Sequence, residues 1–329
     1  MEKPAPLAVT IGEPAGIGPD LILLALAMRK ERRLPPMIVI GDPELLRSRA
    51  SEIGAEFPTT SRKHGLEIVW DRQPLRARPG APCPDDAPAV IGAIEAAVAM
   101  VHRGAASAII TSPIAKAALM QAGFGHPGHT EFLAELAARH WGGKPVPVMM
   151  LAGPRLRAVP VTIHIPLSEV VKSLTTQGIV LTGEITAAAL KSKFGIERPR
   201  IAVAGLNPHA GEEGRIGAED IRIIRPAVEK LRQHGIEVTG PWPADTLFHE
   251  QARSGYDAVL CMYHDQALIP AKMLDFDRTV NVTLGLPFVR TSPDHGTAFD
   301  IAGTGKARPD SFLAALDLAW SMAQREASV

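Results

Sequence analysis

Residues 7–29 read LAVTIGEPAGIGPDLILLALAMR, and this stretch decides the fold class. The apolar run 7–11 predicts a buried strand, and the apolar positions after Pro19 predict a helix that Pro19 opens at its first position. The glycines between them stand at 12, 16 and 18, which is not the G-x-G-x-x-G spacing of a dinucleotide-binding turn. A strand, a glycine-rich loop and a helix in this order indicate the first part of an α/β sheet.

The rest of the chain repeats this alternation. Short β-branched runs predict strands at 37–41, 67–70, 108–111, 147–151, 159–163, 201–206, 236–239, 258–263 and 280–283. Helical patterns predict helices at 19–29, 43–51, 89–103, 115–121, 130–140, 179–194, 218–234 and 311–324. Apolar strands that alternate with amphipathic helices are typical of sheets covered by helices on both faces, so the predicted class is α/β.

The composition excludes several classes of protein. The chain has 329 residues, its 35 basic and 35 acidic residues cancel, and 46% of its residues are hydrophobic. An intrinsically disordered chain has fewer apolar residues and more net charge. A dedicated nucleic-acid-binding protein usually carries a basic excess, so we expect no nucleic-acid partner. A chain of this length forms one large or two medium domains.

The start of the chain, its apolar runs and its cysteines indicate a cytoplasmic protein. Residues 1–8 lack the basic and apolar regions of a secretory signal. The apolar runs 21–28 and 90–101 are too short, or are interrupted by a charge, to cross a bilayer. Cys83 and Cys261 are too few for a disulfide framework. We therefore expect a cytoplasmic location and no membrane association.

Histidines follow three of the predicted strands: His164, His209 and His264. Ligands bind at the carboxyl ends of strands in α/β sheets, so these imidazoles converge if their strands are neighbours or if a subunit interface joins them. Neutral imidazoles suit Zn, Co, Ni, Cu and Fe, and three of them with an open position form a catalytic site. None shows a tight H-x-x-x-H spacing, so each could instead be a hydrogen-bonded core histidine. Both interpretations stay open at this point.

A second polar motif opens the predicted helix 130–140. It reads His126-Pro-Gly-His129-Thr130-Glu131. His129 or Thr130 could simply cap the helix, with Glu131 in its first turn. Alternatively, the free N–H groups of the helix N-terminus, His129 and the Thr130 hydroxyl bind an anion.

Basic and polar residues later in the chain offer further contacts to an anion. Lys272, Asn281 and Arg290 precede a glycine-spaced polar loop, DHGTAFDIAGTG, at 294–305. Arg290 as a bidentate fork and Lys272 as a point charge can neutralise a phosphate or a carboxylate. Taken singly, such a residue is more often a solvated surface charge. A turn accounts for the glycines of 294–305 but not for its Asp, His and Thr residues together.

Eight motifs, in order along the chain, resemble those of the 4-hydroxythreonine-4-phosphate dehydrogenase family of vitamin B6 biosynthesis. They are TIGEPAGIGPD (10–20), TSPIAK (111–116), GHTEFLAE (128–135), TIHIPL (162–167), LNPHAGE (206–212), PADTLF (243–248), MYHDQ (262–266) and VNVTLGLPFVRTSPDHGTAFDIAGTGKA (280–307). Eight ordered motifs are far more specific than one glycine loop.

The resemblance implies a two-domain α/β fold like that of isocitrate and isopropylmalate dehydrogenases, with mixed sheets flanked by helices and a cleft between the domains. It places both chain ends in one domain, formed by 1–130 and 295–329. Residues 131–294 form a middle domain with a dimer interface. The family works as a homodimer whose site uses residues of both subunits.

The resemblance also implies roles for individual residues. The divalent metal is held by His164, His209 and His264, one of them supplied by the partner subunit. The phosphorylated substrate is held by His129, Thr130, Lys272, Asn281 and Arg290. NAD is received through His295, Gly296, Thr297, Asp300 and Gly303. The expected catalytic proton acceptor is Lys272 or Asp245, and Asp265 is a candidate for orienting His264.

The implied reaction is the NAD-dependent and metal-dependent oxidation of 4-phosphooxy-threonine (4-hydroxy-L-threonine phosphate). Decarboxylation then gives 3-amino-2-oxopropyl phosphate for the biosynthesis of pyridoxal 5'-phosphate. A dication lowers the pKa of the alcohol that loses hydride. Histidine ligands favour Zn or Co, with Mn and Mg still open, and no residue by itself distinguishes NAD from NADP.

Two departures from the family's usual pattern leave the substrate open. Segment 276–280 lacks a glycine that is common beside the Val-Asn pair, and Glu213 stands where glycine is common. Relatives oxidise 4-phospho-threonate, 4-phospho-erythronate or aromatic cis-dihydrodiols. Two other classes also stay open: a metal-dependent hydrolase or aldolase that works without NAD, and a non-catalytic metabolite-binding protein.

Overall fold

The computed structural model describes residues 4–61, 65–126 and 128–327, and the chain divides into two compact units. Unit 1 comprises Met1–Pro147 and Leu286–Val329, and unit 2 comprises Val148–Gly285. These boundaries differ from the expected ones, because residues 131–147 and 286–294 fall in unit 1 rather than in the middle domain.

Unit 1 contains parallel strands that are fully buried, except for the strand at the edge, of which only the first residue is buried. Their order in the sheet is β3 (Leu66–Val69), β2 (Met37–Ile40), β1 (Leu7–Thr10), β4 (Ala108–Thr111) and β11 (Val289–Pro293). Each neighbouring pair runs parallel, so the carboxyl ends of these strands meet at one edge.

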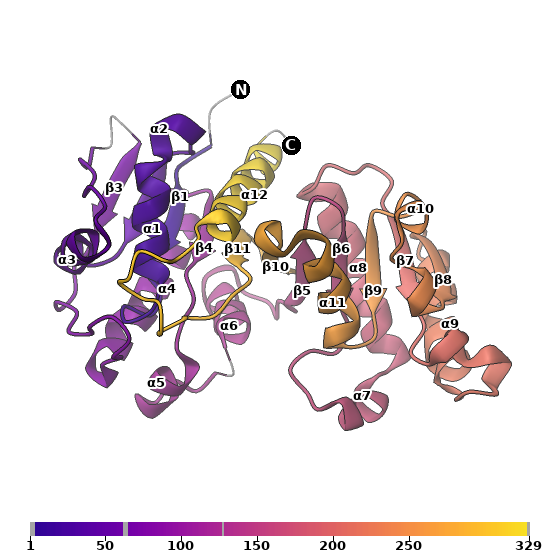
Figure 1. The fold of residues 1–329 in the computed structure, drawn as a ribbon. Helices are drawn as coiled ribbons and strands as arrows, with labels where there is room; N and C mark the ends of the chain where they lie inside the picture. The colour runs from indigo at the N-terminus through magenta and orange to yellow at the C-terminus, as the bar shows by residue number, and fades with distance from the viewer. Residues whose placement is uncertain (1–3, 62–64, 127, 328–329) are drawn as a thin grey trace. The chain divides into compact units, whose positions relative to one another are not determined.

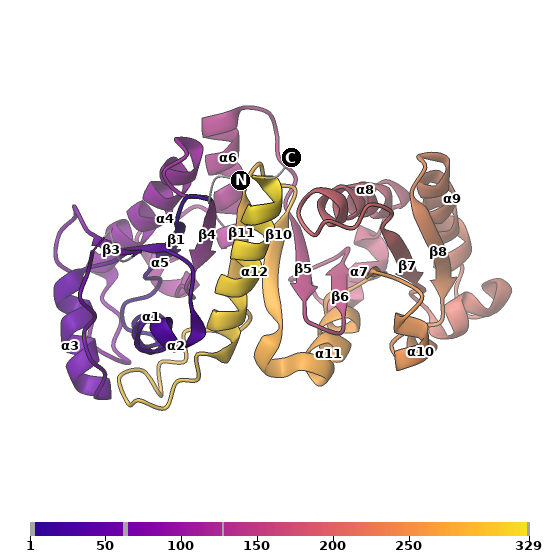
Figure 2. The same ribbon diagram turned by 90° about the horizontal axis from the view of Figure 1, so that it is seen from above.

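Helices cover both faces of this sheet (Figures 1 and 2). One face carries α1 (Gly18–Ala27), α3 (Pro43–Ile53) and α12 (Asp310–Glu326), and the other carries α4 (Ala87–His102) and α6 (His129–Trp141). Shorter elements are α2 (Arg29–Arg32), η2 (Pro84–Asp86) and α5 (Lys116–Gln121). Capping residues set where a helix begins. At the start of α3, the Asp42 carboxylate accepts the Glu44 N–H at 2.9 Å, and Pro43 is the first helical residue.

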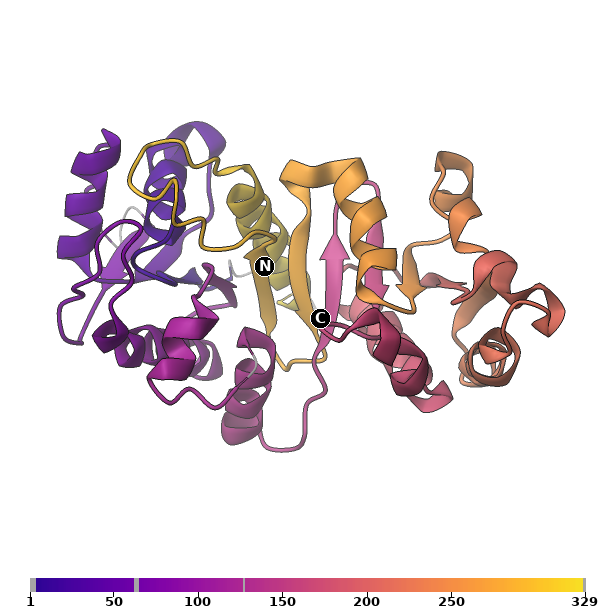
Figure 3. The same cartoon turned by 60° about the horizontal axis from the view of Figure 1, so that its bottom comes forward.

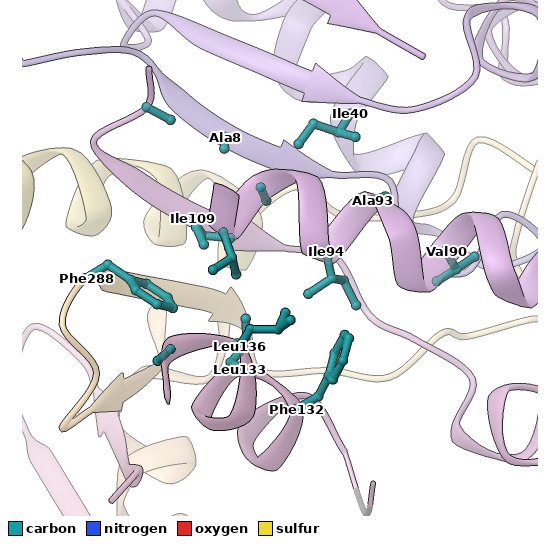
Figure 4. Packing of buried hydrophobic residues seen from close by; sticks show 14 of the residues in the cluster. Ala8, Ile40, Val90, Ala93, Ile94, Ile109, Phe132, Leu133, Leu136 and Phe288 are labelled. Atoms are coloured by element: carbon teal, nitrogen blue, oxygen red, sulfur yellow. The ribbon is translucent and has the colours of Figure 1, made fainter. Parts of the chain in front are cut away.

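A large apolar cluster of unit 1 lies between the sheet and helices α4 and α6 (Figure 4). Ile109 of β4 faces Ile94 of α4, while Leu133 and Leu136 of α6 fill the space beside them. Each is almost completely buried, so truncating one of these side chains to alanine costs about 2–5 kcal/mol. This packing fixes the position of the N-terminus of α6.

Unit 2 contains a mixed sheet. Its order is β10 (Val280–Leu284), β5 (Val148–Ala152), β6 (Arg157–Pro160), β9 (Ala258–Cys261), β7 (Arg200–Ala204) and β8 (Glu237–Trp242). Pairs β10–β5 and β5–β6 are antiparallel, whereas β6–β9, β9–β7 and β7–β8 are parallel. The predicted α/β class with mixed sheets flanked by helices is therefore confirmed.

Helices also lie on both faces of the unit 2 sheet (Figure 2). One face carries α8 (Thr176–Ser192) and α9 (Arg225–Gln233), and the other carries α11 (His264–Asp275). Shorter elements are α7 (Leu167–Ser173), η3 (Pro208–Gly214), η4 (Asp220–Ile224), η5 (Ala244–Thr246), α10 (Glu250–Arg253) and η6 (Phe276–Arg278). Within the described ranges, no helix combines the length and the apolar character that a membrane span needs.

Candidate active site

The guanidinium of a buried arginine reaches the carboxyl end of β4 in the unit 1 sheet. Arg290 of β11 is only 3% exposed, and its guanidinium donates to the Thr111 hydroxyl from Nη2 at 2.6 Å and from Nε at 3.2 Å. Burial lowers the pKa of Arg290 to about 10, so the side chain is still positively charged at neutral pH. A buried positive charge at the carboxyl ends of parallel strands suits an anionic ligand.

Two buried hydroxyls stand at the same strand ends. Ser112 Oγ and Thr10 Oγ1 have no hydrogen-bond partner among the residues that the structure describes, and both side chains are almost fully buried. Thr10 lies opposite Thr111 in the β1–β4 register. A buried hydroxyl without a partner costs about 1–3 kcal/mol, which a bound ligand would recover. Ser112 and Thr10 lie directly at strand ends, within the motifs TSPIAK and TIGEPAGIGPD, but no role was expected for either residue.

His129 is the first residue of α6. Its Nε2 is buried and makes no hydrogen bond within the described part of the chain. Burial, together with the positive charges of Arg290 and Lys116, holds the pKa of His129 well below its usual range. The imidazole is therefore neutral at pH 7 and presents one N–H donor. Lys116, the first residue of α5, lies close by, since a Cβ at Gly128 would be 3.4 Å from its Nζ.

We call Thr111, Ser112, Lys116, His129 and Arg290 the anion cluster. Its members are hydroxyl, ammonium, imidazole and guanidinium groups, all of which can donate hydrogen bonds to an anion. Charged donors make the strong bonds to phosphate oxygens, and the N-terminus of α6 adds a favourable partial charge. Three of the predicted substrate contacts, His129, Thr130 and Arg290, thus lie in unit 1.

The glycine-rich loop 12–18 allows its backbone to pack closely on this cluster. A Cβ at Gly12, whose φ is +73°, would lie 2.5 Å from Pro113 O and 2.8 Å from Ser112 Cβ. At Gly18 a Cβ would lie 3.1 Å from Ser112 Cβ. These glycines therefore serve a close approach between the ends of β1 and β4.

Hydrogen bonds fasten the polar loop 294–305 to the same region, where it runs beside α1 (Figures 1 and 3). Ile17 N–H donates to Thr297 O at 2.9 Å, and Gly303 N–H donates to the Asp20 carboxylate at 2.8 Å. Asp20 is buried and paired with the Arg49 guanidinium. His295, Gly296, Thr297, Asp300 and Gly303 all lie in this loop, and their binding of NAD stays a prediction.

In unit 2, two of the three predicted metal ligands lie together. His164 follows β6, His264 begins α11 after β9, and these strands pair in parallel. Their ring centroids are 5.7 Å apart, beside a pocket of about 330 Å³ that Thr162, Leu167 and Tyr263 help to line.

The histidine pair fits a divalent ion. Metal–nitrogen bonds of about 2.0–2.1 Å place two imidazole centres about 5–6 Å apart around one ion. The Asp265 carboxylate lies 2.7 Å from His264 Nδ1, an arrangement that leaves Nε2 as the ligand atom. This matches the role that we expect for Asp265.

The third histidine lies in η3. His209 follows β7 and is exposed. In the described ranges of this single chain, no group of three His, Cys, Asp or Glu side chains is placed to hold one ion. The three predicted ligands therefore do not form a complete site within one chain.

The other predicted site residues lie in unit 2. Lys272 is half-buried on α11 with its Nζ 6.0 Å from the centre of the Phe276 ring, and Asn281 is in β10. Asp245 is exposed in η5. Their roles stay predictions.

Comparisons with known proteins agree with the motifs. The family model described as "Pyridoxal phosphate biosynthetic protein PdxA" matches residues 33–319. A 4-hydroxythreonine-4-phosphate dehydrogenase of Bradyrhizobium diazoefficiens is 55% identical, with 97% of each chain covered.

Solved structures show the same likeness. The crystal structure of the 4-hydroxythreonine-4-phosphate dehydrogenase of Klebsiella pneumoniae has a TM-score of 0.84 and 40% identity, covering 97% of this chain and 100% of that one. A terephthalate 1,2-cis-dihydrodiol dehydrogenase of Burkholderia xenovorans has a TM-score of 0.65 and 28% identity, covering 97% and 98%. The family model spans most of the chain, and the chain therefore belongs to the PdxA family of pyridoxal phosphate biosynthetic proteins.

Proposed function

We propose that this chain oxidises 4-phosphooxy-L-threonine with NAD and a divalent metal, and that the oxidised product loses CO2 to give 3-amino-2-oxopropyl phosphate. The observation that carries the proposal is the anion cluster. A buried Arg290, a neutral His129 and a buried Ser112 hydroxyl that has no partner among the described residues together suit a phosphate monoester. The 55% identity to a 4-hydroxythreonine-4-phosphate dehydrogenase supports the same substrate.

The phosphate lies away from the carbon that reacts, so its contacts supply binding energy that positions the rest of the substrate. Arg290 would hold two phosphate oxygens as a fork, and Lys116 would add a mobile positive charge. The hydroxyls of Ser112 and Thr130 complete the set of neutral donors. Lys272 and Asn281 are proposed, by family resemblance, as further substrate contacts.

The histidines are proposed to hold a divalent ion, with Zn favoured and Co, Mn or Mg as the other candidates. His164 and His264 supply ligand nitrogens from one chain, and Asp265 orients His264. When bound, such an ion lowers the pKa of the substrate alcohol and stabilises negative charge on its oxygen.

The reaction balances as follows. The alcohol carbon gives a hydride to the nicotinamide ring, and the hydroxyl proton passes to a base for which Lys272 and Asp245 are our candidates. The product is a β-keto acid, whose carboxylate leaves as CO2 with its bonding electrons remaining on the adjacent carbon. That carbon then takes up a proton. The loop 294–305 is proposed to receive NAD.

An apolar surface beside the histidine pair supports a homodimer with a shared site. Leu167 of α7 is 69% exposed, and Ile269, Met273 and Phe276 on and just after α11 are similarly open. Exposed apolar side chains gathered in this way mark an interaction surface. A second copy of the chain seated there would bring the remaining histidine ligand. We also propose a cytoplasmic location, which suits the free thiols of Cys83 and Cys261.

A substrate screen tests the proposal. The purified chain is given NAD, Zn²⁺ or Co²⁺ and, in turn, 4-phosphooxy-L-threonine, 4-phospho-D-threonate, 4-phospho-D-erythronate and an aromatic cis-dihydrodiol, while NADH absorbance is followed. We expect the highest kcat/KM with 4-phosphooxy-L-threonine. Higher kcat/KM with the dihydrodiol would contradict the proposal, because that substrate has no phosphate for the anion cluster.

The Arg290→Met variant tests the role of the cluster. Loss of a charged, bidentate contact costs about 1.5–3 kcal/mol, so KM for the phosphorylated substrate should rise roughly 10-fold to 100-fold. Arg139→Met on the exposed face of α6 is the matched control and should leave KM unchanged. An unchanged KM in Arg290→Met would contradict phosphate recognition by this residue.

A further inference from the structure

Directly after β7 the backbone makes one turn of left-handed helix that carries His209. The φ angles are +51° at His209, +52° at Ala210, +79° at Gly211, +42° at Glu212 and +55° at Glu213. Four of these five residues are not glycine, and an L-residue pays roughly 1–2 kcal/mol in this conformation. The turn is therefore unfavourable by itself and persists only if the surrounding structure holds it.

The buried carboxylate of Asp220, 1% exposed, holds the segment that leads into the turn. Its Oδ1 accepts the Leu206 N–H at 2.9 Å, and its Oδ2 accepts the Asn207 N–H at 3.1 Å and Asn207 Nδ2 at 2.9 Å. The Asn207 side chain also donates to Glu219 at 2.8 Å. Charged acceptors strengthen such bonds, so the backbone entering the turn is firmly fixed.

The turn also packs tightly on Asp220. A Cβ at Gly205 would lie 2.8 Å from Asp220 Oδ1 and 2.9 Å from Ala210 Cα. A Cβ at Gly211 would lie 3.2 Å from Asp220 Cβ and Oδ2. Only glycine allows the carboxylate to sit this close to both the entry and the middle of the turn.

We propose that Asp220 is a positioning residue for His209: it keeps the left-handed turn formed, so that the imidazole is placed before a metal ion binds. The inference rests on the proposed role of His209 as a metal ligand. Asp220 acts through the backbone of Leu206 and Asn207. A ligand on a loop that is already ordered pays less entropy on binding, which raises the affinity for the ion.

The strain of the turn can be tested at one of its residues that is not glycine. Glu213, in this turn, has a φ of +55°. Glycine adopts this conformation without steric cost. The substitution Glu213→Gly should therefore raise the thermal unfolding temperature or leave it unchanged, and it should not weaken metal binding.

The test uses the full-length protein freed of metal and titrated with Co²⁺, whose visible absorption reports the bound ion independently of turnover. In Asp220→Asn the new amide NH₂ cannot accept a hydrogen bond, so at least one backbone contact is lost. We expect Co²⁺ affinity to fall about 10-fold or more. Hydrogen exchange should also quicken at the Ala210 and Ile216 amides, which donate to Asn207 O and Gly211 O in the turn.

Asp86→Asn is the matched control. Asp86 is likewise buried and accepts the Arg76 N–H at 2.9 Å and the Ala77 N–H at 2.8 Å, but it lies in unit 1. This variant should lose stability and keep wild-type affinity for Co²⁺. If Asp220→Asn does not fold, Asn207→Ala replaces it, since it removes only the side-chain bonds to Asp220 and Glu219, and the same direction is expected.

Two contrary results separate the inference from the proposed function. A folded Asp220→Asn protein that exchanges its turn amides faster but binds Co²⁺ as tightly as wild type would overturn the inference and leave the role of His209 intact. A wild-type protein that binds no Co²⁺, or a His209→Ala protein that binds it equally well, would overturn the metal role and the inference with it.

Discussion

At the scale of the residue, the anion cluster is made of side chains whose burial is costly without a ligand. Arg290 keeps its charge in a buried position, and the Ser112 hydroxyl is buried without a partner among the described residues. Stability alone does not favour either arrangement, because removing a charge from water and burying a hydroxyl without a hydrogen bond both destabilise the fold. Buried polar groups of this kind are typical of sites where a ligand supplies the missing hydrogen bonds.

The Ser112→Ala substitution separates binding from stability. Because Ser112 Oγ makes no bond within the described chain, its removal should leave the free energy of unfolding unchanged or slightly higher. The loss of one neutral hydrogen bond to phosphate should raise KM about 5-fold, from roughly 1 kcal/mol. Urea unfolding and steady-state kinetics measure the two effects. A less stable variant with an unchanged KM would assign Ser112 to the fold instead.

The pH dependence of stability reports on His129. Its pKa is lowered in the folded protein by burial and by Arg290 and Lys116. As the pH falls below about 6.5 the unfolded chain takes up the proton first, so the stability present at higher pH is progressively lost. Between about pH 7.5 and about pH 5.5, the free energy of unfolding should fall more in wild type than in His129→Gln. The exposed His102→Gln serves as control and should follow wild type; an equal fall in His129→Gln would contradict a neutral His129.

At the scale of the element, hydrogen bonds join the strand ends that carry the histidines. Gln266, in the first turn of α11, donates to Gly205 O beyond β7 at 2.8 Å and accepts the Met262 N–H after β9 at 2.6 Å. Thr162, after β6, donates to Met262 O at 2.7 Å. The ends of β6, β9 and β7 are thereby fixed to one another just before His164, His264 and His209.

Replacing Gln266 with leucine tests this connection. The change keeps the volume but leaves the buried Met262 N–H and Gly205 carbonyl without their partner, so the free energy of unfolding should fall by at least about 2 kcal/mol. Gln251→Leu on α10 is exposed and should change it by less than about 0.5 kcal/mol. Chemical unfolding measures both. Equal stability of the two variants would show that the bridge contributes little.

The same elements mark what the sequence could and could not predict. Apolar strands followed by turn residues, such as 7–11 and 258–263, are confirmed because burial and periodicity act locally. Strand β11, which reads VRTSP, was missed because its polar side chains are buried by tertiary contacts that no local pattern reveals. Helix α11 was missed because Pro270 interrupts the helical pattern, yet packing keeps the helix continuous.

Some features of the candidate site could likewise be predicted from the sequence, and others could not. The convergence of His164 and His264 follows from the pairing of β6 with β9, which strand order alone does not give. The left-handed turn at His209 could not be predicted, since Ala210, Glu212 and Glu213 all prefer other conformations. Motif resemblance supplied the residue roles that spacing left open.

At the scale of the whole molecule, the proposed metal site requires a second chain. The described part of one chain places only two imidazoles together, and exposed apolar side chains such as Leu167 lie beside them. A homodimer with twofold symmetry would cover this surface twice and build two equivalent sites.

Mixed dimers test the sharing of ligands. His209→Ala and His264→Ala are each expected to be inactive, and the two chains are co-expressed with different tags so that mixed dimers can be purified. If His209 and His264 of one site come from different chains, one site of the mixed dimer keeps both ligands, and up to about half of wild-type activity returns. Dimers of two differently tagged His209→Ala chains are the control. An inactive mixed dimer would place both histidines of a site on one chain.

The most direct test of the central claim compares one substrate with and without its phosphate. The protein is mixed with NAD and Zn²⁺, and NADH absorbance is followed with 4-phosphooxy-L-threonine and with 4-hydroxy-L-threonine. We predict NADH from the phosphorylated compound, with turnover that stops on chelation and returns when Zn²⁺ or Co²⁺ is restored. Equal turnover of the compound without phosphate, or full activity in the chelated protein, would contradict the account.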